Sequence, residues 1–165
     1  MSQSPTSPVD PEDFQDPLEN YDPPTYSGGL EEALAEASAT AIQSTPFTSV
    51  AADIPVHEAV TLLAGLHIAC LLVEEDGKLV GLFTDRDVLD KVALELDEVR
   101  DLPLRDVMTT DPIFVFDTDS AGAVLNVMAV SGYRHVPVLQ SDGSIIGIVS
   151  PQRITKFLRQ HFNEE

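Results

Sequence analysis

Two stretches of the chain show the same order of apolar and polar positions, 66 residues apart. Each has an apolar run, an Asp-Gly pair, and a second apolar run that ends in a glycine, two apolar residues and a hydroxyl residue. An Asp-Gly pair between apolar runs predicts a β-hairpin, because both residues tolerate the positive φ angles of a tight turn. The second run ends as GLFTDRD at residues 81–87 and as GIVSPQR at residues 147–153. We therefore predict two paired strands in each stretch, followed by a helix over residues 85–96 or 151–162.

Apolar residues at helical spacing precede each hairpin. The first helix is predicted to start at Pro55, a residue suited to a first helical turn. Its apolar face would comprise Val56, Ala59, Val60 and Leu63. Residues 117–132 show the same spacing in the second stretch, and short apolar runs at 47–50 and 112–115 predict a strand before each helix. Each stretch is therefore predicted as strand, helix, strand, strand, helix.

A unit of this kind, with about 50 residues, is too small to bury a full core alone. We therefore predict an α+β fold in which two β-α-β-β-α repeats pack together with pseudo-two-fold symmetry. The predicted division of the chain is a disordered acidic tail at 1–28, a helical connector at 29–45, the first repeat at 46–97, a linker at 98–111 and the second repeat at 112–165. The tail holds six of the twelve prolines and has no apolar periodicity. Residues 30–42 of the connector are mostly Ala, Glu and Leu, which favour a helix.

The net charge of −19 narrows the classes of partner. The first 45 residues hold nine acidic residues and no Lys or Arg, and the remainder holds 19 acidic against nine basic residues. This acidity argues against nucleic-acid binding and against docking on an anionic membrane surface. No apolar segment reaches the roughly 18 residues of a membrane span, and the N-terminus lacks the pattern of a signal peptide. With Cys70 as the single cysteine no intrachain disulfide can form, so we expect a cytoplasmic protein.

Several motifs in register resemble a tandem pair of CBS domains, the regulatory unit called a Bateman module. They are GLFTDRD and its echo GIVSPQR, the connector RDVMTTDP at residues 105–112, and RHVPV at residues 134–138. The resemblance covers roughly residues 46–162. It implies an α+β module with two clefts between its sheets, often dimerised face to face. It also implies binding of adenosine-containing ligands such as AMP, ATP or S-adenosylmethionine, and no catalysis.

Thr84 and Asp87 are the main candidates for ligand binding. Thr84 opens a predicted helix, where its hydroxyl and the free amides of the first turn would favour a phosphate. Asp87 is a bidentate acceptor that can hold two ribose hydroxyls. The resemblance likewise places the residue at Asp87 on ribose and that at Thr84 near phosphate. The alternative is structural, because Thr84-x-x-Asp87 also has the pattern of a helix capping box.

The second repeat offers a different set of candidates. Ser150 keeps the hydroxyl, but Arg153 stands where Asp87 has its counterpart, so it would either meet a phosphate or face solvent. Arg134 and His135 occupy positions where the family often places cationic phosphate contacts, although an exposed pair at a strand edge is equally consistent with the sequence. Thr48 matches a family position that helps to hold adenine or ribose, and is otherwise an ordinary strand residue.

These observations predict a sensor that is not an enzyme. An adenine nucleotide would enter the cleft of Thr84 and Asp87, with Mg²⁺ bridging a polyphosphate as an option. No covalent cofactor is expected, and the four histidines show no metal-ligand spacing. The expected partners are a second copy of the chain and an unidentified regulated protein, with no nucleic acid and no membrane. The alternative is a dimerisation or interaction protein with vestigial clefts that acts through its acidic tail.

Overall fold

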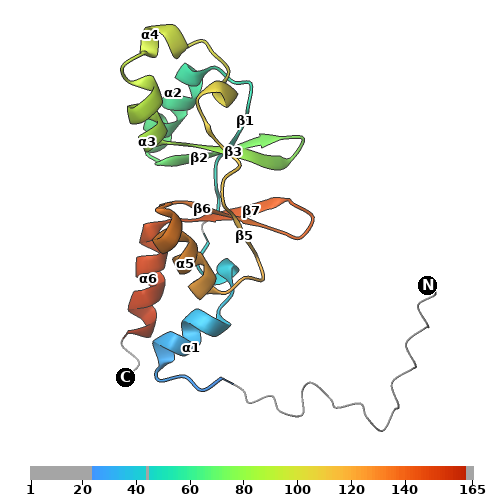
Figure 1. Cartoon of the computed structure of the whole chain (residues 1–165), viewed down its shortest axis with the longest axis vertical. Coiled ribbons are helices and arrows are strands. Elements are labelled where there is room, and N and C mark those ends of the chain that lie inside the picture. Colours follow the sequence, from blue (N-terminus) through green and yellow to red (C-terminus); the bar gives the residue numbers. More distant parts are fainter. Residues whose placement is uncertain (1–23, 44, 163–165) are drawn as a thin grey trace, which may run out of the picture.

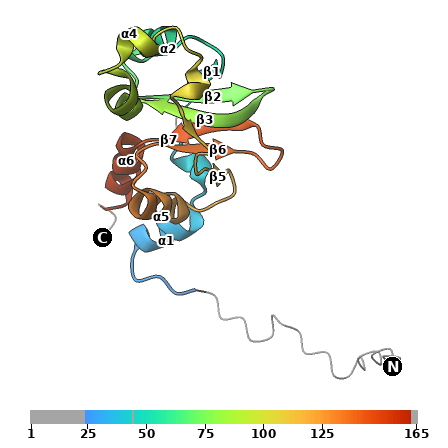
Figure 2. The ribbon, with the colours of Figure 1, turned by 45° about the horizontal axis from the view of Figure 1, so that its top comes forward.

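The computed structural model describes residues 24–43 and 45–162, and it contains two β-sheets that face each other (Figure 1). The first sheet has the order β1 (Ser49–Ala51), β2 (Cys70–Glu75), β3 (Lys78–Thr84), β4 (Thr109–Thr110), and the second has the order β5 (Val115–Phe116), β6 (Val136–Leu139), β7 (Ile145–Val149). In each sheet the first strand pairs in parallel with the second, and the second and third strands form an antiparallel hairpin. Helices cover the outer face of each sheet, as Figure 2 shows from a second direction. The predicted α+β fold of two repeats is confirmed.

The helices fall into the same order in both repeats. They are α1 (Gly29–Glu36), the 3₁₀-helix η2 (Ala39–Ala41), α2 (Val56–Leu66), α3 (Asp85–Asp87) with its continuation as the π-helix η3 (Val88–Val92), α4 (Leu96–Val99), the 3₁₀-helix η4 (Leu104–Asp106), α5 (Ala121–Ser131) and α6 (Pro151–His161). The longest have 11 residues. Within the described ranges, therefore, no helix has the length and apolar character to cross a membrane. The cytoplasmic location stays a prediction.

Both predicted hairpins are present. Asp76 and Gly77 turn between β2 and β3 with φ angles of 51° and 75°, and Gly143 turns between β6 and β7 with φ of 85°. Each hairpin carries an irregularity after the residue that pairs with the motif glycine: Val73 pairs with Gly81, and Val138 with Gly147. The two repeats therefore match even in the residue pairs at which their hairpins become irregular.

The core lies in three clusters, one under the helices of each repeat and one between the two sheets. Strand β2 shows how one run contributes to two of them. Its residues Leu71 and Val73 pack under the helices of the first repeat, whereas Cys70 and Leu72 pack toward the second sheet with Ile148. Successive side chains of a strand point to opposite faces. Because both faces are buried there, the first four residues of the strand, 70–73, are continuously apolar instead of alternating.

Three predicted boundaries were wrong. The predicted helix over 30–42 ends at Glu36, because the amides of Ala39 and Ala121 bond with the carbonyls of Asp119 and Ala37, respectively, and tie this segment to the second repeat. The helix predicted over 85–96 changes to a π-helix after Asp87 and ends at Val92. The strand predicted at 112–115 starts only at Val115, as β5, whereas β4 forms in the predicted linker, before Asp111 with its φ of 47°.

The segment that precedes each repeat packs on the other repeat. Ser38, from the first segment, forms an isolated bridge with Ser120 at the start of α5, and Pro103, from the linker, forms one with Pro55 at the start of α2. Ala39 and Ile42 belong to the core of the second repeat, and Leu104 and Val107 to that of the first. The chain therefore crosses between the repeats twice, and the two predicted connectors are part of the two cores.

Gln43 and Met108 occupy equivalent positions in these two segments. A Cβ atom on Gly81 would lie 2.5 Å from Met108 Sδ, and one on Gly147 would meet Gln43 Oε1. A side chain at either glycine would therefore have to displace the side chain that crosses the strand. Met108 is apolar, whereas Gln43 Oε1 is buried with no hydrogen-bond partner among the described residues.

We therefore expect Gln43→Met to stabilise the protein. Removing a buried acceptor without a partner should recover about 1 kcal/mol, and the variant copies a side chain that the first repeat already accommodates. This corresponds to a rise in Tm of about 2–4 °C, measurable by calorimetry. Met108→Gln, the reverse change in the other repeat, serves as the control and should lower Tm. A lower Tm in Gln43→Met would show that the Gln43 amide has a favourable role in the fold.

Candidate functional site

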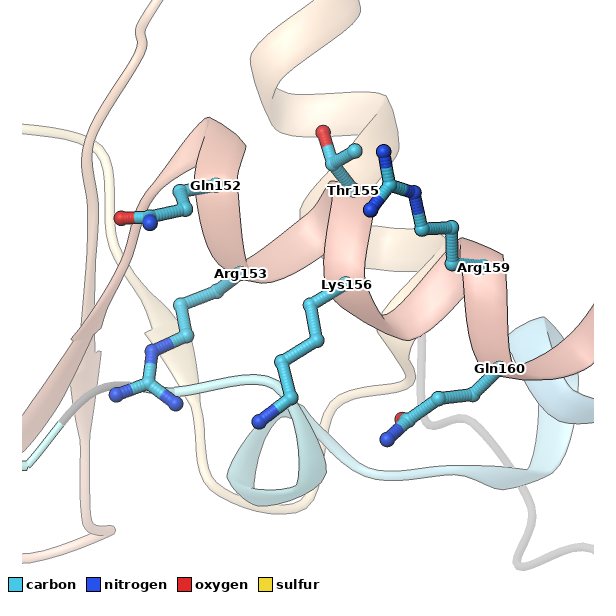
Figure 3. Close-up of a pocket in the computed structure, with 6 residues that line it drawn as sticks. All are labelled: Gln152, Arg153, Thr155, Lys156, Arg159 and Gln160. Atoms are coloured by element: carbon cyan, nitrogen blue, oxygen red, sulfur yellow. The ribbon is translucent and has the colours of Figure 1, made fainter.

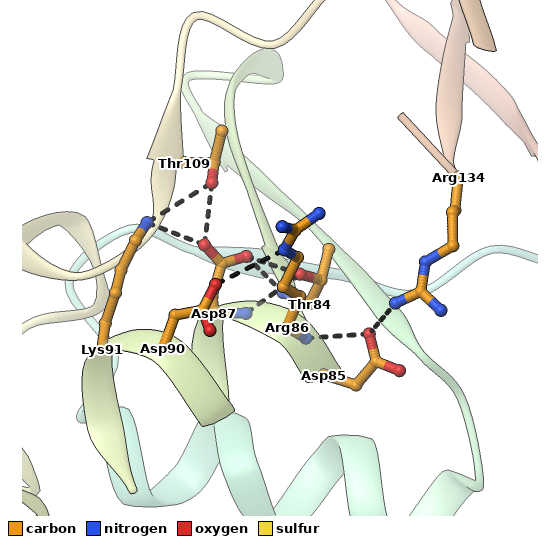
Figure 4. Close-up of polar contacts among 8 residues, drawn as sticks. All are labelled: Thr84, Asp85, Arg86, Asp87, Asp90, Lys91, Thr109 and Arg134. Carbon is orange, nitrogen blue, oxygen red and sulfur yellow. Dashed lines mark hydrogen bonds and ion pairs between the residues drawn. The ribbon is translucent and has the colours of Figure 1, made fainter. Parts of the chain in front are cut away.

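Thr84 and Asp87 form a complete capping box at the start of α3 (Figure 4). Asp87 N donates to Thr84 Oγ1 at 3.2 Å, and Thr84 N donates to Asp87 Oδ2 at 2.9 Å. The Thr84 hydroxyl also donates to Asp87 Oδ2, at 2.7 Å. The structural alternative weighed from the sequence is thus present in the molecule. The same contacts hold the Asp87 carboxylate in one orientation.

The other oxygen of Asp87 binds two side chains that the sequence did not single out. Thr109 Oγ1 donates to Asp87 Oδ1 at 2.8 Å, and Lys91 Nζ lies 2.7 Å from the same atom. Asp87 is only 6% exposed, the one charged residue buried in the described part of the chain. Burial alone would raise its pKa, but the hydrogen bonds from Lys91, Thr84 and Thr109 outweigh this and lower the pKa below its usual range. Asp87 is therefore an ionised acceptor at neutral pH.

Only one of these two partners, Lys91, could have been found from the sequence. Asp87 and Lys91 stand four residues apart, the spacing of a helical ion pair. Thr109 belongs to the RDVMTTDP motif, which we assigned to the linker. Its contact with Asp87 depends on strand β4 pairing with β3, where Leu82 faces Thr109. A two-residue strand formed across the linker leaves no pattern in the sequence.

A cavity of about 280 Å³ opens beside this cluster, between the two repeats. Thr84, Asp87, Lys91 and Thr109 line it from the first repeat and its linker, and residues 131–135 close it from the second repeat. Arg134 Nη2 binds Asp85 Oδ1 at 3.0 Å and so joins the two repeats at this point (Figure 4). The structure therefore brings four of the seven predicted site residues, Thr84, Asp87, Arg134 and His135, into one cavity.

The phosphate site predicted at the helix start is altered. The amide of Arg86 donates to Asp85 Oδ1 at 2.8 Å, and that of Asp87 donates to Thr84 Oγ1. Helix α3 itself has three residues before the π-helix begins. Because these amides already have acceptors within the protein, a phosphate in this cavity would depend on the cationic side chains that line it, Arg86, Lys91 and Arg134.

Thr48 and Ser150 line a second cavity, of about 480 Å³. Its walls are more apolar and include Phe47, Cys70 and Ile148. Arg134 and His135 line this cavity as well as the first. Ser150 makes no capping bond with its side chain, in contrast to Thr84. The second cavity therefore has two hydroxyls and the shared cation Arg134, but no carboxylate among its lining residues.

Arg153 lines neither of these cavities. It lies on α6 beside Lys156, and both side chains extend along the same side of the helix (Figure 3). Asp87 can fold back to the amide of its own cap residue, whereas an arginine has no acceptor to offer there. The structure therefore places Arg153 at the hollow beside α6 and not at either cavity, and its role in ligand binding stays a prediction.

Burial shifts the pKa of two residues near the cavities. It lowers the pKa of His135, and the neighbouring Arg134 lowers it further, while Asp85 opposes both. His135 is thus a neutral imidazole at neutral pH and can approach a phosphate only as a hydrogen-bond donor. Burial, together with the charges of Asp87 and Asp85, raises the pKa of Cys70 to about 12, so it remains a thiol. In the described ranges, no three His, Cys, Asp or Glu side chains gather closely enough to hold a metal ion.

A family model described as "CBS domain" matches the chain twice, at residues 39–94 and 104–160. Together these matches cover more than half of the chain. The fold and the two cavities define a tandem pair of such repeats, and the chain belongs to the CBS domain family. Both matches start ahead of the repeat boundaries predicted from the sequence, at residues that the structure places in the two connecting segments.

Relatives and solved structures agree with this family. The CBS domain-containing protein CBSCBSPB5 of Arabidopsis thaliana is 33% identical over 81 residues, which are 49% of this chain and 15% of that protein. The chain therefore matches only a small part of that relative's length. A crystal structure of CBSX2 in complex with AMP is 21% identical with a TM-score of 0.69, and covers 75% of this chain and 97% of that one. A crystal structure of the CBS domain pair of protein MJ0100, in complex with 5′-methylthioadenosine and S-adenosylmethionine, is 24% identical with a TM-score of 0.65. The match covers 73% of this chain and 98% of that one.

Proposed function

We propose that this protein is a regulatory sensor that binds an adenosine-containing nucleotide in the first cavity and has no catalytic activity of its own. The observation that carries the proposal is the Asp87 carboxylate, which lines this cavity opposite Arg134. A nucleoside phosphate needs an acceptor for its ribose hydroxyls and a cation for its phosphate, and these two groups supply them. CBS pairs of similar fold are described in complex with AMP or with S-adenosylmethionine, which supports this ligand class.

Binding would exchange contacts that the protein makes with itself. Ribose hydroxyls would take the places of donors such as Thr109 on the Asp87 carboxylate. A phosphate would draw Arg134 away from Asp85, a contact that joins the two repeats. Because that contact changes, a ligand would favour one arrangement of the repeats over another, and this difference is what a regulated protein would detect.

Thermal melts with a panel of adenosine compounds test the proposal. We expect AMP, ATP with and without Mg²⁺, S-adenosylmethionine or 5′-methylthioadenosine to raise Tm. At a hundredfold its dissociation constant a ligand stabilises the folded state by about 2.7 kcal/mol, a shift of several degrees. The shift in Tm should be absent in Asp87→Asn and retained in Asp90→Asn. Asp90 lines the same cavity, but its carboxylate binds Arg86. If no compound shifts Tm at millimolar concentration, the sensor proposal fails.

A second candidate is an interaction protein whose cavities no longer bind ligand. The observation that favours it is the full set of internal partners around Asp87, which would also suit a purely structural cap. The acidic tail, residues 1–28, would then recruit the partner; its first 23 residues lie outside the described part of the chain. Deleting residues 1–23 separates the candidates, since a sensor keeps its ligand shift and an interaction protein loses its partner.

We also propose that two copies of the chain associate. The resemblance to CBS pairs implies a homodimer, and α2 and the π-helix η3 carry exposed leucines that could contribute to its interface: Leu62, Leu66 and Leu89 are 36%, 52% and 69% exposed. Burial of these leucines against a second copy would remove them from water.

For this association we expect light scattering to give the mass of two chains for the native protein and of one chain for Leu66→Glu. A charge placed in an apolar interface without a partner costs several kcal/mol, enough to separate the subunits. Leu94→Glu, at a leucine 97% exposed beyond the π-helix, is the control and should leave the mass of two chains. A single-chain mass for the native protein at micromolar concentration would contradict the proposal.

A further inference from the structure

Helix α6 carries the densest positive charge in an otherwise acidic chain. Three of the nine Lys and Arg residues, Arg153, Lys156 and Arg159, lie on its eleven positions, which include no Asp or Glu. They line an open hollow of about 850 Å³, with Arg153 and Lys156 extending to one side of the helix and Arg159 to the other, next to Thr155 (Figure 3). Ile154 and Phe157, which do not line the hollow, are buried in the second core. We call Arg153, Lys156 and Arg159 the basic face of α6.

The opposite charge lies in the segment that precedes the described residues. Residues 1–23 contain six acidic residues and no Lys or Arg: Asp10, Glu12, Asp13, Asp16, Glu19 and Asp22. This segment enters the described fold at Pro24, just ahead of α1, and α1 packs against both α5 and α6 (Figures 1 and 2). The acidic residues are therefore attached to the chain next to the helix that holds the basic face.

The segment between the acidic residues and α1 is long enough for these residues to reach the basic face of α6. Between Asp10 and Gly29 there are 18 residues, which span up to about 60 Å when extended. Helix α6, with 11 residues, is about 16 Å long. A tether of this kind keeps the acidic segment at an effective concentration of roughly millimolar near its target, so weak ionic contacts are enough for occupancy.

We propose that the acidic segment, residues 10–22, docks on the basic face of α6 of the same chain. Charge complementarity and tethering support this occupant. A separate polyanion such as nucleic acid would have to approach a protein with a net charge of −19 and would be repelled at long range. The docked segment would also lie next to the second cavity, because Gln152 lines both that cavity and the hollow of the basic face.

Paramagnetic broadening in the full-length protein tests this docking. A nitroxide is attached to Gln15→Cys; Cys70 is buried and stays a thiol, so the label reacts at the new cysteine. We expect the amide signals of residues 152–160 to lose at least half of their intensity at 20 mM salt, and to recover it at 500 mM, where ionic contacts are screened. Signals of α2, on the other repeat, should keep their intensity.

Two charge-reversal variants provide the matched controls. Lys156→Glu with Arg159→Glu should abolish the broadening, whereas Lys78→Glu with Arg100→Glu, which makes the same change of net charge in the first repeat, should preserve it. All four side chains are exposed, so the fold should tolerate both variants. Equal broadening in the two variants, or broadening spread over both repeats, would overturn the proposal.

Mixing labelled and unlabelled chains separates docking within one chain from docking between two. Spin-labelled protein at natural isotope abundance is mixed with ¹⁵N protein that carries no label. In this mixture the nitroxide and the ¹⁵N nuclei are on different chains. If the α6 signals broadened as strongly as in the sample where both are on one chain, the segment would dock on a second copy, and docking within the chain would be overturned. No nucleotide is present, so the result does not depend on the proposed sensor.

Discussion

Replacing Asp87 by alanine is expected to lower Tm by about 6–12 °C and to remove the response to nucleotide. The variant loses the acceptor for Thr84, Thr109 and Lys91, which together hold the start of α3 against β4. Loss of a helix cap and of hydrogen bonds to a buried charge costs about 3 kcal/mol in the free energy of unfolding. For a chain of this size each kcal/mol shifts Tm by about 2–4 °C.

Asp90→Ala is the control for this effect. Asp90 lines the same cavity, but its contact with Arg86, at 3.4 Å, is between two exposed side chains. An exposed ion pair contributes less than about 1 kcal/mol, so its Tm should stay close to that of the native protein. Calorimetry of both variants and of the native protein measures these Tm values. If Asp87→Ala melts within 2 °C of the native protein, the hydrogen bonds around Asp87 do not stabilise the fold.

The pH dependence of the Asp87 effect has a definite sign. The pKa of Asp87 is lowered in the folded protein, so the unfolded state binds a proton more readily. Its stabilising effect is therefore fully present above the unfolded pKa of about 3.9, and is lost as the pH falls through the lower folded value. The difference in unfolding free energy between the native protein and Asp87→Ala should be constant from pH 7 to pH 5 and should shrink below pH 4. A constant difference down to pH 3 would contradict this linkage.

Local patterns allowed the repeats to be predicted, whereas long-range pairing did not follow from them. The Asp-Gly turns, the apolar runs and the Thr84 cap each depend on neighbours in the sequence, and the structure confirms all three. Thr109 was missed because its role comes from pairing β4 with β3. The break after Glu36 was missed because the residues that follow it favour a helix, while their backbone bonds with the second repeat decide the conformation.

The same limit applies to the candidate site. Thr84 and Asp87 are close in sequence, and Arg134 and His135 could be placed beside them only through the resemblance to CBS pairs. The sequence placed Ser150 among the candidates of the second repeat and gave Thr48 no particular cleft, and the structure places both residues in a cavity separate from that of Thr84 and Asp87. What the structure adds is that Arg134 and His135 line both cavities, so an anionic ligand in one would compete for the cation used by the other.

Arg134→Ala is therefore expected to weaken the binding of a phosphate-bearing nucleotide by about tenfold to a hundredfold, the loss of one hydrogen-bonded charge pair of 1.5–3 kcal/mol. Arg86→Ala is the matched control, since it removes the same charge from the same cavity at a side chain held by Asp90. Its effect on the dissociation constant, measured by calorimetry, should stay within about threefold.

The partner of Arg134 gives a prediction of the opposite sign. Asp85 now holds the guanidinium at 3.0 Å and adds a negative charge near the proposed phosphate. Asp85→Asn would release Arg134 and remove that repulsion, so we expect tighter binding of AMP with little change for adenosine, which has no phosphate. If Arg134→Ala weakened adenosine as strongly as AMP, the arginine would act by joining the two repeats and not by binding phosphate. Weaker binding of AMP in Asp85→Asn would likewise mean that the ion pair shapes the cavity, and that ligand and Asp85 do not compete for Arg134.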